Sequence, residues 1–279
     1  MKTLRSFLAV ALFATGAMAK DIDLSGEWRF ALDPQDLGIK SAPDGWRFPD
    51  KIRLPGIVTA QGFGDNPSFQ TAWTGDGWRY PQMFKEWQAD ENFKFPFFLQ
   101  PPKHYVGPAW YRREIEIPAD WQGARILLHL ERVHWQSTTW IDDKEAGKAD
   151  SLGTPHEFDL GKPAPGKHSL TLRIDNRIGD VNVGPLSHSV TDHTQGNWNG
   201  VVGKIELRRS GEYRISSVRA FPSSDGTVKL RVAGNLGAEA GEKPVISVRD
   251  VEAGLVEVGH GVPVRKDDGS FELEIAAKI

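Results

Sequence analysis

Short segments in which apolar and polar residues alternate run through most of this sequence. In "SLTLRID" (169–175), three aliphatic residues alternate with Thr171, Arg173 and Asp175, which predicts a half-buried strand with those polar residues facing solvent. Further short strands are predicted within residues 124–133, 137–147 and 203–209. No part of the chain after the N-terminal segment sustains a helical apolar period of 3.6 residues for three turns. The chain is therefore predicted to be all-β.

Turn residues separate these strands. A Pro-Gly turn at 164–168 precedes the strand that contains "SLTLRID", and "DDKE" (142–145) is typical of a hairpin tip. Short strands joined in this way favour an antiparallel sandwich or jelly roll over about residues 21–210. We place this domain at residues 20–211.

A second domain is predicted at residues 212–279. Five short strands separated by turns such as Ser-Asp-Gly and Asp-Asp-Gly indicate an immunoglobulin-like sandwich. Such a sandwich normally needs about seven strands and about 100 residues. Because 67 residues follow position 212, we expect this second sandwich to be incomplete.

The first 19 residues have the pattern of a secretory signal peptide. Lys2 and Arg5 precede a short apolar stretch, and Ala17-Met18-Ala19 fits a cleavage site. The apolar stretch is shorter than the roughly 20 residues that a membrane-spanning helix needs. We therefore expect an exported protein, periplasmic or secreted, that is cleaved after Ala19 and does not bind a membrane.

Composition excludes several classes of function. The formal net charge of −3 becomes −5 without Lys2 and Arg5, and this argues against nucleic acid as a partner. The absence of cysteine excludes disulfides and thiolate chemistry. His129 and His134 lie five positions apart on one strand and so face opposite sides, and the histidines show no metal-ligand spacing. We expect no metal and no cofactor.

Residues 62–108 form a long irregular connection that is rich in aromatic residues. Connections of this length are usually functional or disordered, and disordered segments contain few aromatics. We therefore expect the segment to fold over one face or end of the sandwich. Most of its rings should fill a small core there, with one or two exposed at a site.

The stretch "TDHTQGNWNG" (191–200) precedes a strand and contains almost no aliphatic residues. Its hydrogen-bonding side chains and single indole suit a pyranose, which presents many hydroxyls and one apolar face. The predicted substrate-binding residues are Asp192, His193, Gln195, Asn197, Trp198 and Asn199. The alternative is structural: Asp192 and Asn197 could form Asx-turns, and Trp198 could close the end of the sandwich.

A series of motifs in consistent order resembles the N-terminal sugar-binding domain of glycoside hydrolase family 2. The series covers about 190 residues, and its members are Leu-Ser-Gly-Glu-Trp-Arg-Phe (24–30), Leu-Pro-Gly (54–56), Gly-Pro-Ala-Trp-Tyr-Arg-Arg (107–113), the hairpin at 128–147 and the run at 158–176. The resemblance implies a galactose-binding-like jelly roll, followed by an immunoglobulin-like domain. Family members such as β-galactosidases and β-glucuronidases are retaining glycosidases whose two catalytic Glu lie in a (β/α)₈ barrel.

The resemblance gives the loop a role, because the jelly roll in this family contributes a loop to the sugar pocket. Asp192 matches an acidic position that reaches substrate hydroxyls in some members. We find no barrel pattern and hence no catalytic residues in this chain. The Glu residues considered for an acid/base pair, all expected to face solvent from strands, are Glu27, Glu114, Glu116, Glu131 and Glu206.

Two hypotheses follow. In the first, the chain is the non-catalytic N-terminal portion of an exported family 2 hydrolase, with a carbohydrate substrate and a C-terminal catalytic barrel as partners. In the second, it is a stand-alone carbohydrate-binding module. An incomplete second sandwich favours the first hypothesis. In both, the chain alone is predicted to be inactive as an enzyme.

Overall fold

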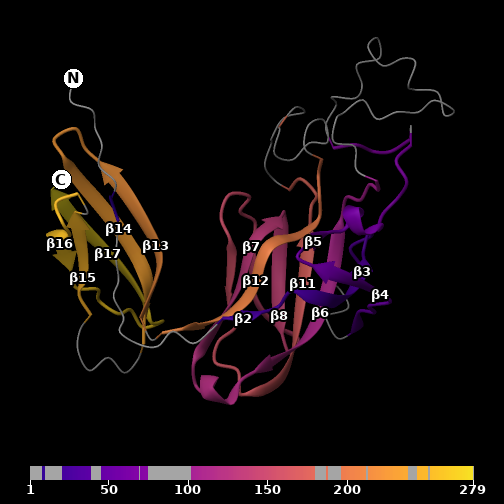
Figure 1. Ribbon diagram of the computed structural model, residues 1–279, viewed down its shortest axis with the longest axis horizontal. Helices are drawn as coiled ribbons and strands as arrows, with labels where there is room; N and C mark the ends of the chain where they lie inside the picture. The colour runs from indigo at the N-terminus through magenta and orange to yellow at the C-terminus, as the bar shows by residue number, and fades with distance from the viewer. Residues whose placement is uncertain are drawn as a thin grey trace, which may run out of the picture. The chain divides into compact units, whose positions relative to one another are not determined.

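The structure of the chain is a computed structural model, which describes residues 8–9, 21–38, 45–68, 70–74, 102–179, 187, 196–211, 213–237, 244–250 and 252–278. The chain divides into two compact units, residues 20–209 and residues 210–279, the latter together with the first 19 (Figure 1). Strands in both units pair antiparallel, and the predicted all-β fold is confirmed. Among the described residues, no helix is long and apolar enough to cross a membrane.

A six-stranded sheet forms one layer of the first unit, in the order β4-β3-β6-β11-β8-β9. Its strands are β3 (Gly26–Leu32), β4 (Asp50–Leu54), β6 (Pro108–Ile117), β8 (Gln136–Ile141), β9 (Lys144–Ala149) and β11 (Gly166–Asp175). The tip between β8 and β9 contains Asp142 and Asp143 with φ of 46° and 64°, so the predicted hairpin is confirmed.

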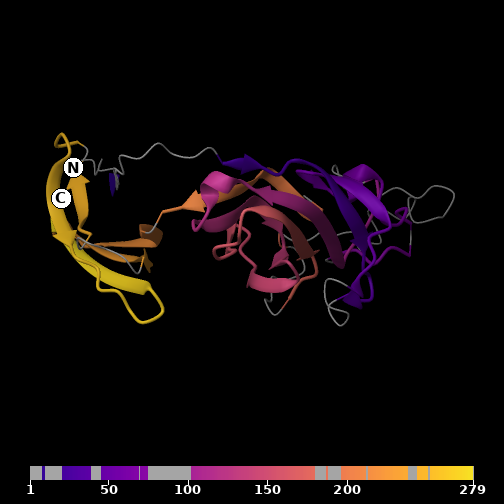
Figure 2. The same cartoon turned by 90° about the horizontal axis from the view of Figure 1, so that it is seen from below.

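The second layer is a five-stranded sheet in the order β10-β7-β12-β2, with β5 also paired to β12. Its strands are β2 (Ile22–Asp23), β5 (Gly56–Ile57), β7 (Arg125–His134), β10 (His156–Asp159) and β12 (Gly200–Ser210). Two 3₁₀ turns, η1 (Thr59–Gln61) and η5 (Ala119–Trp121), lie between strands. The two layers face each other (Figure 1 and Figure 2), and between them lie fully buried side chains such as Trp28, Leu128 and Leu172.

The outer face of β11 corrects one prediction. Alternation predicts that Thr171, Arg173 and Asp175 face solvent, yet all three are buried. Their partners on neighbouring strands include Trp110 and Trp140, whose rings stack with centroids 5.3 Å apart. Aromatic residues from the chain between β3 and β4 pack against these two indoles. A central strand covered on both faces is buried throughout, whatever its alternation.

Ion pairs compensate the burial of charge on this face. The guanidinium of Arg173 lies 2.8 Å from Asp36 and 2.9 Å from Asp175, and that of Arg177 lies 2.7 Å and 2.6 Å from the same carboxylates. Burial opposes the ionisation of Asp36, but the hydrogen bonds from both arginines outweigh it and lower the pKa of this carboxyl. The network ties the segment after β3 to the end of β11.

The five Glu residues considered for catalysis lie on β3, β6, β7 and β12. Glu206 corrects the expectation that all of them face solvent, because it is 8% exposed and lies beside Arg208. Glu27 pairs with Lys51 at 2.7 Å, and Glu114 pairs with Lys167 at 2.8 Å. These contacts are those of structural surface carboxylates.

The second unit contains two three-stranded sheets, β13-β14-β17 and β1-β15-β16. The strands are β1 (Leu8–Ala9), β13 (Tyr213–Pro222), β14 (Thr227–Leu236), β15 (Ile246–Asp250), β16 (Val256–Gly261) and β17 (Ser270–Lys278). The five strands predicted after position 212 are therefore confirmed. A core that includes Leu230, Val248, Phe271 and Ile275 holds this unit together. That the sandwich is incomplete, and that residues 1–19 are a signal peptide, remain predictions.

The irregular segment 62–108 is described only in part. Its described residues before β6 contain no strand, and one isolated bridge joins Asp65 to His104. Trp73 and Tyr105 are buried, as expected for rings that fill a core. The remaining tryptophans of the segment lie outside the described residues.

The β8–β9 hairpin is fastened by His168 on β11. Its Nδ1 lies 2.5 Å from the Asp142 carboxylate and its Nε2 lies 2.6 Å from the Ala164 carbonyl. Burial favours the neutral imidazole, but these two contacts outweigh it and raise the pKa of His168. A raised pKa means that folding favours the protonated form, so the stabilisation is present below the ordinary value and is lost as the pH rises through the folded value.

His168→Gln should therefore lower the free energy of unfolding of the first unit at acidic pH and flatten its decline above about pH 6.5. Denaturation followed by tryptophan fluorescence measures this unit alone, because all ten tryptophans precede position 210. His260→Gln in the second unit is the control. If the free energy of unfolding of His168→Gln had the same pH profile as that of the parent, the pH dependence could not be assigned to His168.

Candidate functional site

The end of the first unit where β11 ends and β12 begins contains the described part of the predicted sugar loop. Residues 196–200 are described there. Asp192, His193 and Gln195 lie outside the described residues, so their role in substrate binding remains a prediction.

Asn199 is fully buried, and its side chain binds the frame of the sandwich. Its Nδ2 donates to the carbonyls of Gly107 and Ile174 at 2.9 Å and 3.0 Å, and its Oδ1 accepts from the Tyr111 hydroxyl at 3.0 Å. Burial raises the pKa of Tyr111, so this phenol stays protonated as a donor. These contacts favour the structural alternative for Asn199.

Asn197 forms a reciprocal pair with Asn176, the first residue after β11. Asn197 Nδ2 donates to the Asn176 carbonyl at 2.9 Å, and Asn176 Nδ2 donates to the Asn197 carbonyl at 3.2 Å. Asn176 also accepts from the Gly107 amide and donates to the Tyr105 carbonyl. Asn197 is buried, and a second bond from its Nδ2 reaches Thr74. The contacts of Asn197 are likewise structural.

We call Asn176, Asn197 and Asn199 the asparagine hub. Asn176 is not among the site residues predicted from the sequence, although it closes the run at 158–176 that carries the family resemblance. Its place in the sequence could have identified it: a polar residue directly after an alternating strand can supply the donor that the first carbonyls beyond the strand end need.

Trp198 is a described loop residue whose side chain keeps an exposed part. It is half-buried, and its ring centroid lies 5.0 Å from that of His134 at an interplanar angle of 31°. The Trp198 carbonyl accepts from His134 Nδ1 at 2.7 Å, which fixes the proton on that nitrogen. His134 thus contacts both the ring and the carbonyl of Trp198, and the platform role of Trp198 remains a prediction.

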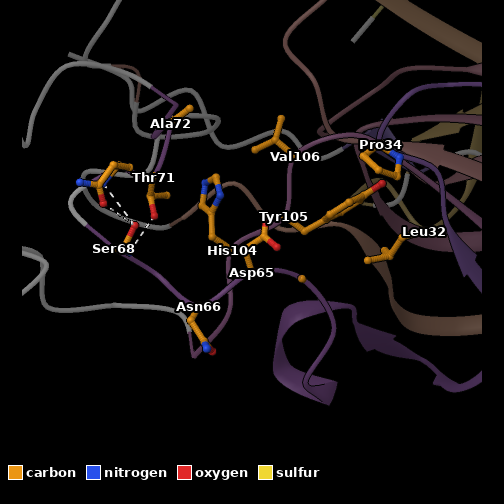
Figure 3. A pocket seen from close by; sticks show the side chains of 12 residues that line it. Leu32, Pro34, Asp65, Asn66, Ser68, Thr71, Ala72, His104, Tyr105 and Val106 are labelled. Atoms are coloured by element: carbon orange, nitrogen blue, oxygen red, sulfur yellow. Dashed lines mark hydrogen bonds between the residues drawn. The ribbon is translucent and has the colours of Figure 1, made fainter.

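A cavity of about 590 Å³ lies beside the hub (Figure 3). Its walls come from the chain around Asp65 and Thr71 and from His104 to Val106, with Leu32 and Pro34 on one side. Tyr105 connects the cavity to the hub, since it lines the cavity and its carbonyl accepts from Asn176. The length and the aromatics of segment 62–108 mark it in the sequence as functional, whereas the polar residues that line the cavity are not predicted.

Within the described ranges, no three His, Asp or Glu side chains are grouped so that they could hold a metal ion.

Asn199→Ala should lower the free energy of unfolding of the first unit by about 2–4 kcal/mol, because two buried carbonyls lose their donor and a buried phenol loses its acceptor. Asn66→Ala, at an exposed position of the same unit, should change it by less than about 0.5 kcal/mol. Urea denaturation followed by tryptophan fluorescence compares the two. Equal stabilities would show that Asn199 is not structural.

Known proteins similar to this chain are glycosidases. It is 26% identical over 165 residues to a β-galactosidase of Arthrobacter sp. (strain B7), a match that covers 56% of this chain and 16% of the relative. It is 21% identical over 169 residues to a β-glucuronidase of Paenibacillus borealis, covering 60% of this chain and 23% of the relative. No protein-family model matches the chain.

Solved structures of Ruminococcus gnavus β-glucuronidase share the fold. The complex with D-glucaro-d-lactam gives a TM-score of 0.53 at 17% identity over 96% of this chain and 41% of that one. The complex with D-glucuronic acid gives 0.52 at 18% identity over the same shares. This chain thus spans less than half the length of these relatives. The motifs in order, the all-β sandwich and these relatives together show that the chain carries a domain like that of glycoside hydrolase family 2.

Proposed function

We propose that this chain is the non-catalytic N-terminal portion of an exported glycoside hydrolase of family 2 and takes part in the hydrolysis of O-glycosidic bonds in carbohydrates. The observation that carries the proposal is the match to a β-galactosidase and a β-glucuronidase of which the chain spans 16% and 23%. A C-terminal barrel would supply the two catalytic carboxyls, about 5–5.5 Å apart in a retaining enzyme. The signal-peptide pattern of residues 1–19 supports export.

In this proposal the first unit positions part of the sugar pocket. The asparagine hub fixes positions 176 and 197, the two ends of the loop that contains Asp192. A carboxylate on that loop would accept hydrogen bonds from sugar hydroxyls, and the exposed part of Trp198 would pack on the apolar face of the ring. The chemistry of bond cleavage would belong to the barrel.

The chain of 279 residues should not release p-nitrophenol from p-nitrophenyl β-galactoside or β-glucuronide above the uncatalysed rate, because retaining hydrolysis needs a nucleophile and an acid/base carboxyl that the proposal assigns to the barrel. A spectrophotometric assay measures this. Turnover that disappears in a single Glu→Gln variant, such as Glu131→Gln, would refute the non-catalytic role.

Asp192→Ala should leave the free energy of unfolding within about 0.5 kcal/mol of the parent, as is usual for a loop carboxylate. When the chain is joined to its barrel, the same change should lower kcat/KM about 10- to 150-fold, the loss expected for one charged hydrogen bond to substrate. Asp120→Ala, at an exposed position within η5, is the matched control.

If the Asp192→Ala protein were destabilised but had normal kinetics per folded molecule, a role of this loop in substrate binding would be refuted. The alternative, a stand-alone binding module, predicts tight sugar binding without a barrel. Calorimetric titration of this chain with galacto-oligosaccharides that gave a dissociation constant below about 100 μM would favour that alternative.

A further inference from the structure

Three cationic side chains lie directly opposite one another on neighbouring strands of the six-stranded sheet. Arg29 on β3 is paired with Lys51 on β4 and with Arg112 on β6, and the three strands lie side by side (Figure 1). We call these residues the cation row. Like charges that are directly opposite in a sheet are destabilising. A departure of this kind from the local rules of folding is expected at a functional site.

Carboxylates compensate the two ends of the cation row. The Lys51 ammonium lies 2.7 Å from Glu27, and the Arg112 guanidinium lies 2.9 Å from Asp143. Arg112 also donates through Nε to the Ser169 hydroxyl at 2.7 Å. Both ends of the row therefore have fixed partners within the protein.

Arg29, in the middle of the row, has no carboxylate within ion-pair distance in the part of the chain that the structure describes. Its contact is with the ring of Phe48, whose centroid lies 5.6 Å from the guanidinium carbon, and Arg112 faces the same ring at 5.9 Å. Glu114 lies two positions beyond Arg112 and so on the same face of the sheet, but Lys167 holds it at 2.8 Å. The exposed guanidinium of Arg29 is thus available to a ligand.

A pocket of about 320 Å³ lies beside Arg29 and Arg112, and Lys167 and Ser169 at the start of β11 also line it. The Lys167 ammonium has two hydrogens besides the one that it donates to Glu114. The Ser169 hydroxyl accepts from Arg112 and still has its own hydrogen to donate. With the five N–H groups of Arg29, these side chains give the pocket a set of hydrogen-bond donors.

The carboxylates around the pocket face other cationic or ionisable groups. Asp142, which lines the pocket, lies 2.5 Å from Nδ1 of His168. Glu116, which is not among the lining residues, lies directly opposite Lys167 on β6 and β11. Among the described contacts, the charge of Arg29 is therefore the one left without an opposite charge, and an anion in the pocket would meet it directly.

The placement of the donors favours a tetrahedral anion. In the sheet, β6 lies between β3 and β11, so Arg29 and Lys167 approach the pocket from opposite sides of β6. A phosphate or sulfate group presents oxygens in several directions, whereas a carboxylate presents two in one plane. Arginine suits such groups, because its planar fork donates two parallel hydrogen bonds to them.

We propose that this pocket binds a phosphate or sulfate group, with Arg29 as the principal ligand and with Lys167 and Ser169 as further donors. This site does not depend on the proposed function. Strand β11 begins beside the pocket and ends at the asparagine hub, so the anion site and the predicted sugar loop lie at opposite ends of this strand.

Amide chemical shifts of the whole chain, titrated with sodium sulfate at constant ionic strength, test the site. The amides of residues 29, 112 and 167–169 should shift and saturate with a dissociation constant on the order of 1 mM. Arg29→Gln should weaken binding about tenfold, the effect of one lost charged hydrogen bond. Arg29→Lys, which keeps the charge but not the fork, should weaken it about threefold.

Arg132→Gln is the matched control, because it removes the same charge from an exposed position of β7 in the other layer of the first unit. It should bind sulfate as the parent does. Arg29→Gln should fold, since the Arg29 side chain is exposed. Sulfate stabilises proteins in general, so the comparison between variants decides. In melting followed by tryptophan fluorescence, sulfate should raise the Tm of the parent and of Arg132→Gln more than that of Arg29→Gln.

Inorganic phosphate and methyl phosphate distinguish the possible sources of the group. Equal affinities would show that the free ion fills the site, and tighter binding of the ester would indicate a group carried on a larger molecule. Either result upholds the proposal.

Three results would overturn it: no saturable shift of these amides at about 20 mM sulfate, some twentyfold above the expected dissociation constant; equal sulfate affinity in Arg29→Gln and Arg132→Gln; or the same shifts with sodium nitrate, which would indicate screening alone. None of these results bears on Asp192, so the anion site and the proposed function fail separately.

Discussion

The first unit depends on how backbone groups are satisfied where its strands end. Beyond β11 and before β12 the strand ladder stops, and buried carbonyls and amides there need other partners. The asparagine hub supplies them: side-chain amides bind the carbonyls of Tyr105, Gly107 and Ile174, which belong to segments far apart in the sequence. The wall of the cavity and both ends of the predicted sugar loop are consequently fixed by the same few side chains. The loss of one of these contacts is therefore expected to disturb both the cavity wall and the ends of the loop.

This arrangement explains why hydrogen-bonding residues crowd into one short stretch of sequence. Two residues of the stretch, Asn197 and Asn199, are buried and bind the backbone at the strand ends of the sandwich. Trp198 lies between them, half-buried against His134, with a part of its side chain left exposed. Composition alone does not separate residues that build a site from residues that bind its ligand, because both tasks require amides and carboxylates. Burial separates them, and burial depends on contacts with Gly107 and Ile174 that no local pattern contains.

Much of the fold follows from local sequence rules, and the exceptions have a common cause. Alternation and turn residues are enough to predict many strands of both units, such as β7, β11 and β14, and the hairpin at Asp142 and Asp143. They fail for Arg173 and Glu206, which are buried although alternation turns them away from the core. At Arg173 the cover comes from a segment more than 100 residues earlier in the chain, through Asp36. The cavity escapes prediction for the same reason, since three segments that are distant in the sequence line it.

The reciprocal bonds between Asn176 and Asn197 have a consequence for how such a protein can diversify. They close a loop at its base, independently of the twenty residues between them. The entropy of loop closure grows only with the logarithm of loop length, so doubling the insert costs about 0.6 kcal/mol. Insertions, deletions and substitutions between these two residues are thus compatible with the reciprocal bonds between Asn176 and Asn197. The sandwich is thus the part of the first unit that must be kept, and the insert between Asn176 and Asn197 is the part that can be exchanged.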